Sequence, residues 1–338
     1  MNLAHAIPAR RVLLPATLDR TPPPLGGRVH EFGGRTMGTT WSVRLVASVR
    51  LQRDPVVRAI QQELATVVAQ MSTWDADSAL SRFNRAEPGS WHVLPDEFHA
   101  VLGCARDVAE RSDGAFDPTA GALVDAWGFG PVPRGAMPPA AHLTQVRAQA
   151  GWRRLDLDPV RRALLQPGRL ALDLSAIAKG YGVDQVARRL RALGLDSHLV
   201  EVGGELRGSG VKPDGRPWWV KLEHPDAEAG AAPVLLALHG LSVATSGDYR
   251  RWFEQDGVRY SHTIDPRDGL PIRHGLAAVT VIHPECMQAD AWSTALGVLG
   301  PIAGPALASR LGLAARFVVR RGAGFEELTS AGYDRLLQ

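Results

Sequence analysis

The strongest constraint on the fold is a run of strand-like segments between residues 197 and 281. Their sequences are HLVEVGGELRGSG, PWWVKLEH, VLLALHG, LSVATSG, RYSHTIDP and AAVTVIH. Such short segments, bounded by glycine, proline and aspartate, are typical of strands joined by turns. The run therefore predicts a sizeable, mainly antiparallel sheet.

Helical patterns flank this run. Apolar residues recur at helical spacing over 56–71, 95–111 and 183–193, and helices are also expected over 286–299 and in a short stretch ending at Ala150. Further strands are expected at Thr40–Val46, in LALDLS before Ser175, on both sides of Asp158-Pro159, and in LAARFVVRR, with a short helix after Thr329. The 24 prolines and 35 glycines argue against a helical bundle. The expected class is α+β: mixed, mainly antiparallel sheets packed with helices.

Composition narrows the possible partners. The net charge of +3 is spread along the chain without a basic block, so no nucleic-acid partner is expected. Cys104 and Cys286 have neither metal-type nor redox-type spacing, so neither a zinc site nor a disulfide framework is expected, and both are expected to be plain buried thiols. No stretch approaches the roughly 18 apolar residues that span a bilayer, so no transmembrane segment is expected. Residues 1–30, with a proline triplet and little periodicity, are expected to be a flexible N-terminal segment before one folded domain, 31–338.

One candidate metal site lies in the expected helix QADAWSTALGVLG. Asp290 and Thr294 are four residues apart and so share a face of the helix. Carboxylate and hydroxyl oxygens suit Mg²⁺, which binds few protein ligands and completes its octahedron with phosphate and water. In the alternative, Asp290 only complements the helix dipole and Thr294 only packs.

Two further constellations could hold a nucleotide. In DLSAIAKG, Asp173 ends an expected strand, Ser175 is a candidate N-cap and Lys179 lies early in the helix, where anions bind readily. Local capping and a solvated lysine explain these residues equally well. Glycine pairs in a strand pattern allow close approach of a ligand or mark a bulge. If a ligand approaches closely, the residues expected to contact the nucleotide are Gly203, Gly204, Glu205 and Ser246.

His262 is the candidate base. Alternation places Tyr260, His262 and Ile264 on one face before a DPRDG turn, and an imidazole of ordinary pKa, about 6.5, can accept a hydroxyl proton near neutrality. Most histidines near turns are only hydrogen-bonded. Trp74, Trp127 and Phe129 lie in loop-like contexts and could stack on flat rings, although core packing is the alternative for each. Neither of the common phosphate-binding glycine motifs occurs.

The order of eight sequence blocks resembles one family, the FAD:protein FMN transferases or ApbE-like flavin transferases, over about residues 31–330. The blocks are MGTTW (37–41), MSTWDADSALSRFN (71–84), GAFDPTAGALVDAWGFG (114–130), DLSAIAKGYGVDQVA (173–187), VEVGGELRGSG (200–210), ATSGDYR (244–250), YSHTIDP (260–266) and ADAWSTALGVLG (289–300). The resemblance implies a T-fold-like flavin transferase architecture, with the FAD and Mg²⁺ site between its α/β halves.

The resemblance also implies roles for individual residues. The positions where the family contacts FAD are Met37, Trp74, Asp173, Lys179 and Ile264, with the loop Ala126, Trp127, Gly128 and Phe129 near the adenine side. The positions where the family holds Mg²⁺ are the carbonyl of Ala176 and the side chains of Asp290 and Thr294, and His262 stands at the position of the catalytic base.

The implied reaction is phosphoryl transfer: a Thr or Ser hydroxyl of an acceptor protein, expected to be a redox-complex subunit, attacks the FMN-side phosphorus of FAD, and AMP leaves. A Mg²⁺-dependent FAD pyrophosphatase and a non-enzymatic FAD-binding carrier are the alternatives. The sequence shows neither a signal segment nor a cysteine before Cys104, which points to the cytoplasm, whereas many members of the family are periplasmic lipoproteins. Ala122 and Gly182 replace common family residues without removing a chemical group.

Overall fold

The computed structural model describes residues 11–15, 26–133, 136–225, 233–249, 251–322 and 324–337. The helices are α1 Arg53–Met71, α2 Ala79–Asn84, α3 Asp96–Arg111, α4 Gly121–Ala126, α5 Ala140–Gln149, α6 Ala178–Ala192, α7 Cys286–Arg310 and α8 Ala331–Asp334, with a 3₁₀ turn at Trp152–Arg154. The strands are β1 Arg11–Leu13, β2 Gly27–Thr36, β3 Thr39–Ser48, β4 Trp91–Val93, β5 Leu157–Asp158, β6 Ala163–Leu165, β7 His198–Val202, β8 Glu205–Ser209, β9 Trp218–Lys221, β10 Val234–Leu238, β11 Leu241–Gly247, β12 Trp252–Gln255, β13 Val258–Ser261, β14 Ile264–Asp265, β15 Leu270–Pro271, β16 Leu276–His283, β17 Ala314–Arg321 and β18 Gly324–Thr329.

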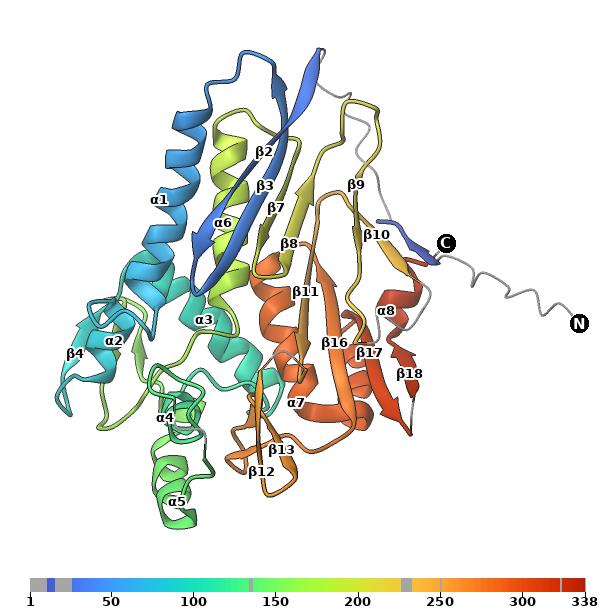
Figure 1. Ribbon diagram of the computed structural model, residues 1–338. Coiled ribbons are helices and arrows are strands. Elements are labelled where there is room, and N and C mark those ends of the chain that lie inside the picture. Colours follow the sequence, from blue (N-terminus) through green and yellow to red (C-terminus); the bar gives the residue numbers. More distant parts are fainter. Residues whose placement is uncertain are drawn as a thin grey trace, which may run out of the picture.

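The main sheet has eight strands in the order β18-β17-β16-β11-β8-β7-β3-β2 (Figure 1). Every neighbouring pair in it is antiparallel. The predicted α+β class with mainly antiparallel sheets is therefore confirmed.

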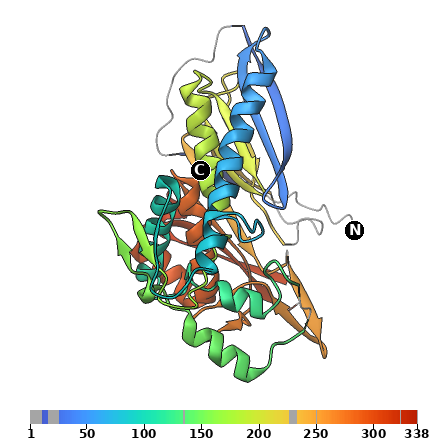
Figure 2. The ribbon, with the colours of Figure 1, turned by 90° about the vertical axis from the view of Figure 1, so that its left-hand side faces the viewer.

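Both faces of this sheet are covered, because successive side chains of a strand point to opposite faces. On one face, Val43 and Val200 pack against α1 and α6. On the other face, Leu199 and Val243 pack against residues of β9 and β10. The helices α1, α6 and α7 lie side by side on the first face, as the two views show (Figures 1 and 2).

Most expected elements are present, but three local predictions were wrong. LALDLS is not a strand, because only Ala171 makes an isolated bridge, to Ala120. The context expected to be loop-like around Trp127 contains a helix, since α4 ends at Ala126 and Trp127 is its C-cap. Gly203 and Gly204 do not interrupt a strand: both have positive φ (63° and 102°) and form the turn of the β7–β8 hairpin. Strand β18 was not predicted.

The described part of the N-terminal segment, residues 11–15 and 26–30, contains one short strand and the start of a second. Arg11–Leu13 forms β1, which pairs in parallel with β10, and the Leu13 side chain is fully buried. Strand β2 begins at Gly27, inside the segment 1–30. Residues 1–10 and 16–25, which include the proline triplet, lie outside the described residues.

Helix α7 is longer and more apolar than the sequence suggested. Its mean hydropathy of 1.2 and its 25 residues meet the length and composition of a membrane span, the one described helix that does so. However, 61% of that apolar window is buried inside the protein, and Gly300 interrupts the helix with a φ of 78°. Its core position explains the apolar composition.

The two cysteines are both free thiols, as expected. Cys286 is fully buried, and burial raises its pKa well above the ordinary value. Cys104 is partly buried, and burial raises its pKa to about 12. Neither thiol is therefore a reactive thiolate near neutrality.

Acid is expected to destabilise the fold through His198. This residue is fully buried at the start of β7, its Nδ1 donates to the Leu195 carbonyl (2.7 Å), and burial lowers its pKa from 6.5 to about 4. Above pH 6.5 His198 is neutral in both the folded and the unfolded chain, so its titration does not lower the free energy of unfolding there. As the pH falls from 6.5 to 4, the unfolded chain takes up a proton that the folded chain excludes, which costs about 3 kcal/mol.

Urea unfolding at pH 7 and pH 4.5 tests this expectation. The unfolding free energy of His198→Asn, which cannot titrate, is expected to fall less over this interval than that of the parent protein. An equal fall in the free energy of unfolding of the two proteins would show that His198 does not cause the loss of stability in acid.

Candidate active site

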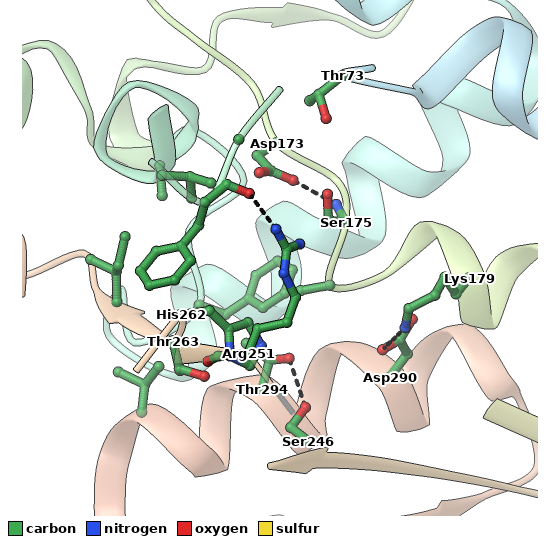
Figure 3. Close-up of a pocket in the computed structure, with 18 of the residues that line it drawn as sticks. Thr73, Asp173, Ser175, Lys179, Ser246, Arg251, His262, Thr263, Asp290 and Thr294 are labelled. Carbon is green, nitrogen blue, oxygen red and sulfur yellow. Dashed lines mark hydrogen bonds and ion pairs between the residues drawn. The ribbon is translucent and has the colours of Figure 1, made fainter. Parts of the chain in front are cut away.

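A cavity of about 410 Å³ opens where the N-terminal end of α6, the first half of α7 and the β12–β13 hairpin meet the loop around α4 (Figure 3). Its size lies within the range of small-molecule sites. Thirteen predicted site residues line it: Met37, Trp74, Phe129, Asp173, Ala176, Lys179, Gly203, Glu205, Ser246, His262, Ile264, Asp290 and Thr294. Asp290 and Ala176 thus line the same cavity, as the metal-site hypothesis requires.

One wall is formed by the close contact of α6 with α7. The Asp290 carboxylate is 3% exposed, and its Oδ2 accepts the Gly180 N–H (3.0 Å). Lys179 Nζ lies 3.6 Å from Asp290 Oδ1 and 2.7 Å from Glu205 Oε1. One lysine thus joins carboxylates from α7 and β8 at the N-terminal end of α6.

Gly180 is required for this contact. A Cβ at this position would lie 2.4 Å from the Cys286 carbonyl oxygen and 2.8 Å from the Asp290 Cβ. Since these distances are shorter than any van der Waals contact, a larger residue would push α6 away from α7.

Replacement of Gly180 by alanine is therefore expected to lower the free energy of unfolding by about 1–3 kcal/mol. Gly103→Ala in α3 is the matched control, because its Cβ would meet nothing within 4 Å, and this change is expected to stabilise by about 0.5–1 kcal/mol. Urea unfolding measures both changes, and equal effects would contradict the close-contact argument.

Hydroxyl groups extend the same wall toward β11. The Ser246 Oγ lies 3.0 Å from the Thr294 Oγ1 and 2.7 Å from the Ser293 Oγ. Thr294 is one helical turn beyond Asp290, so both side chains point from α7 into the cavity (Figure 3). A carboxylate and a hydroxyl from α7 therefore line the same cavity as Ala176.

The donor set at this wall fits Mg²⁺ better than a transition metal. No group of three or more His, Cys, Asp or Glu side chains with metal-binding spacing occurs among the described residues. The cavity lining includes the Asp290 carboxylate, the Thr294 hydroxyl and the residue Ala176, whose backbone carbonyl is a third hard oxygen donor. Mg²⁺ is commonly bound by such a small set, with phosphate and water completing the shell.

His262 also lines the cavity and lies directly after β13. Its Nδ1 and its backbone N–H both contact the carbonyl oxygen of Arg251, at 3.0 and 3.1 Å. Because a carbonyl can only accept, the neutral ring carries its proton on Nδ1, and Nε2 is the basic nitrogen. The Phe129 ring packs edge-on against the imidazole, with centroids 6.2 Å apart.

Two more acidic groups face the cavity. Asp173 Oδ1 accepts the Ser175 N–H (2.7 Å), and the N-cap of α6 is Ile177 rather than the expected Ser175. Asp117 accepts hydrogen bonds from Thr119 and from the Trp152 N–H (2.9 Å). Burial nevertheless raises the pKa of Asp117 above its ordinary value.

Four residues predicted to contact the cofactor do not line the cavity: Ala126, Trp127, Gly128 and Gly204. Trp127 is 1% exposed, donates from Nε1 to the Gly269 carbonyl (2.8 Å) and stacks on Tyr260 with centroids 5.6 Å apart. Its role in this structure is core packing beneath the cavity wall. By contrast, Trp74 lines the cavity and is 57% exposed.

Arg251, Asp117 and Thr263 line the cavity but were not predicted as site residues. Asp117 and Thr263 lie inside blocks already recognised, FDPTAG and YSHTIDP, so those blocks were the available signal. Arg251 directly follows the block ATSGDYR, and no residue pattern distinguishes it from other surface arginines.

Comparison with known proteins agrees with this geometry. Residues 37–317 match the family model described as the ApbE family. The chain belongs to the ApbE family. A relative in Haemophilus influenzae named FAD:protein FMN transferase is 36% identical over 319 residues, 92% of each chain, and one of the same name in Vibrio cholerae is 37% identical over 92% of this chain and 93% of the relative.

Solved structures of members of the family are also similar to this protein in fold and sequence. The apo form of the flavinyl transferase ApbE of Pseudomonas stutzeri superposes with a TM-score of 0.85 at 44% identity, covering 92% of this chain and 97% of that chain. The flavin transferase ApbE of Vibrio cholerae gives 0.85 at 35% identity, covering 92% and 99%. The predicted family and its flavin transferase architecture are thereby confirmed.

Proposed function

We propose that this protein transfers the FMN half of FAD to a Thr or Ser hydroxyl of an acceptor protein with the help of Mg²⁺, releasing AMP. Flavin transferase activity itself was predicted and is confirmed by the names of relatives that match over nine tenths of this chain. The observation that supports the finer proposal is that one cavity is lined both by hard oxygen donors, at Ala176, Asp290 and Thr294, and by a histidine, His262.

Electrostatics favours a bound cation in this cavity. Its lining carries four carboxylates, Asp117, Asp173, Glu205 and Asp290, against the cations Lys179 and Arg251. A diphosphate would add further negative charge at short range, where repulsion in a partly buried site amounts to several kcal/mol. A divalent cation removes this repulsion.

The residues that would hold Mg²⁺ are Asp290, Thr294 and the Ala176 backbone, and the bound ion would neutralise charge on the diphosphate. Lys179, at the same wall, would bind a phosphate oxygen while keeping its contact with Glu205. Both groups lie near the N-terminal end of α6, where the helix dipole also favours anions.

His262 would accept the proton of the attacking hydroxyl. The acceptor oxygen forms a bond to the FMN-side phosphorus, its proton moves to Nε2, and the bond from that phosphorus to the AMP-side bridging oxygen breaks. The products are a phosphoester-linked flavin on the acceptor, free AMP and a proton. The Nδ1 contact to the Arg251 carbonyl keeps the imidazole oriented throughout.

Apolar side chains provide surfaces for the flat rings of FAD. Met37, Phe129 and Ile264 line the cavity, and the exposed Trp74 also lines it. Aromatic rings in such positions stack on flavin or adenine. We propose that the acceptor is a subunit of a redox complex, which would use the attached flavin for electron transfer.

Mass measurement on an acceptor tests the proposal. A polypeptide with a candidate Thr or Ser is incubated with FAD, Mg²⁺ and this protein, and the expected product is an adduct that is heavier by one FMN less water. Substitution of the acceptor hydroxyl residue by alanine should abolish the adduct. Free FMN and AMP without an adduct would favour the pyrophosphatase, and tight FAD binding without AMP release would favour the carrier.

A further inference from the structure

We propose that Arg251 is a further catalytic residue, whose guanidinium binds the phosphoryl group under attack. The proposal rests on the proposed flavin transfer. It concerns a side chain between Gly247 and β12 that lines the same cavity as His262 (Figure 3).

The hairpin fixes Arg251 beside the base. Arg251 immediately precedes β12 and His262 immediately follows β13, and these two strands pair from Trp252 opposite Ser261. The Arg251 carbonyl accepts both the backbone N–H and the Nδ1–H of His262. The His262 ring is therefore held against the backbone of Arg251, and both residues line the cavity.

The charge of Arg251 is available to a substrate. Lys179, the other cation of the cavity lining, already lies near two carboxylates. Arg251 makes no ion pair within the described part of the chain, and its guanidinium Nη2 donates to the Phe129 carbonyl at 3.3 Å. A guanidinium has five N–H donors in a planar fork, so it can keep this contact and still bind phosphate oxygens.

A positive charge near His262 suits the proposed phosphoryl transfer. The proposed metal donors lie on α7 and the segment before α6, and their charge acts on the diphosphate from that side. Phosphoryl transfer spreads negative charge over the equatorial oxygens of the transferred group, which pass close to the attacking hydroxyl. Arg251 supplies a positive charge on the side of the base, where that hydroxyl enters.

The test compares Arg251→Ala with Arg259→Ala. Arg259 is an exposed arginine on the same hairpin that does not line the cavity; it donates to the Asp248 carbonyl (3.0 Å) and lies over the Trp252 ring. For R251A we expect kcat for FMN transfer to fall about 100-fold, with the KM for FAD changed less than about threefold. R259A is expected to retain the parent kcat.

Two further measurements separate catalysis from structure. The Arg251 carbonyl remains in every variant, so the contact to His262 is kept. Guanidinium ion added in solution is expected to restore part of the kcat of R251A and to leave R259A unchanged. Arg251→Lys, which keeps a charge without the fork, is expected to lose about tenfold.

The proposal is overturned if R251A keeps the kcat of R259A, if its loss is confined to KM, or if guanidinium restores none of the lost kcat. A parent protein that forms no flavin adduct on any acceptor would instead overturn the proposed function. The first set of results requires an active parent, so the two failures are distinguishable.

Discussion

Replacement of Asp290 by asparagine is expected to lower the rate of FMN transfer about 10²- to 10³-fold. The carboxylate is the one charged donor among the three proposed Mg²⁺ ligands, and losing it removes roughly 3–4 kcal/mol of charge stabilisation. The fold should change little, by about 1 kcal/mol, because an amide oxygen can still accept the Gly180 N–H. Transfer rates over a Mg²⁺ titration measure the effect, and the half-saturating Mg²⁺ concentration should rise.

Asp248→Asn is the matched control for this change. The Asp248 carboxylate forms two 2.7 Å hydrogen bonds to Arg320 and does not line the cavity of the active site. This variant should show the parent dependence on Mg²⁺. An Asp290→Asn protein that keeps its parent rate at limiting Mg²⁺ would disprove the metal assignment.

Replacement of His262 by alanine is expected to lower the transfer rate about 10²- to 10⁴-fold, the range that a positioned general base contributes. FAD binding should remain, since the substitution leaves Asp290 and Lys179 and their ion pair in place. Flavin fluorescence measures FAD affinity, and AMP release in the presence of an acceptor measures the reaction.

Two variants make this result specific. His262→Gln keeps a polar side chain at this position but provides no base, so it should be as inactive as His262→Ala. His92→Ala, which removes a histidine that contacts Ser90 and Phe83 away from the cavity, should be fully active. Full activity of both His262 variants would remove the base assignment.

Helices and strands whose apolar residues recur at regular spacing were predicted well from the sequence. The helices α1 and α3 and the strands between 197 and 281 have apolar residues at regular spacing, and each lies where the spacing placed it. Short helices and strands contain too few residues to show a regular spacing of apolar side chains. Helix α4, with six residues, and the edge strand β18 were missed for this reason, and LALDLS is apolar because it is buried rather than because it pairs.

The candidate site was predicted mainly through ordered sequence blocks. Those blocks led to the lining residues on α6, on α7 and directly after β13. Close approach of α6 and α7 constrains the sequence, as at Gly180. They did not distinguish Trp127 from Trp74: the first is 1% exposed and the second 57%, a difference decided by tertiary packing alone. Arg251 enters the cavity only because β12 and β13 pair, which no local pattern reveals.

A crystal structure of the protein with FAD and Mn²⁺, a scatterer that can replace Mg²⁺, tests the central claim most directly. The account predicts an anomalous peak bonded to the Asp290 carboxylate and to the diphosphate of FAD, with the FMN-side phosphorus facing His262. A peak at any other position, or FAD bound outside this cavity, would contradict it.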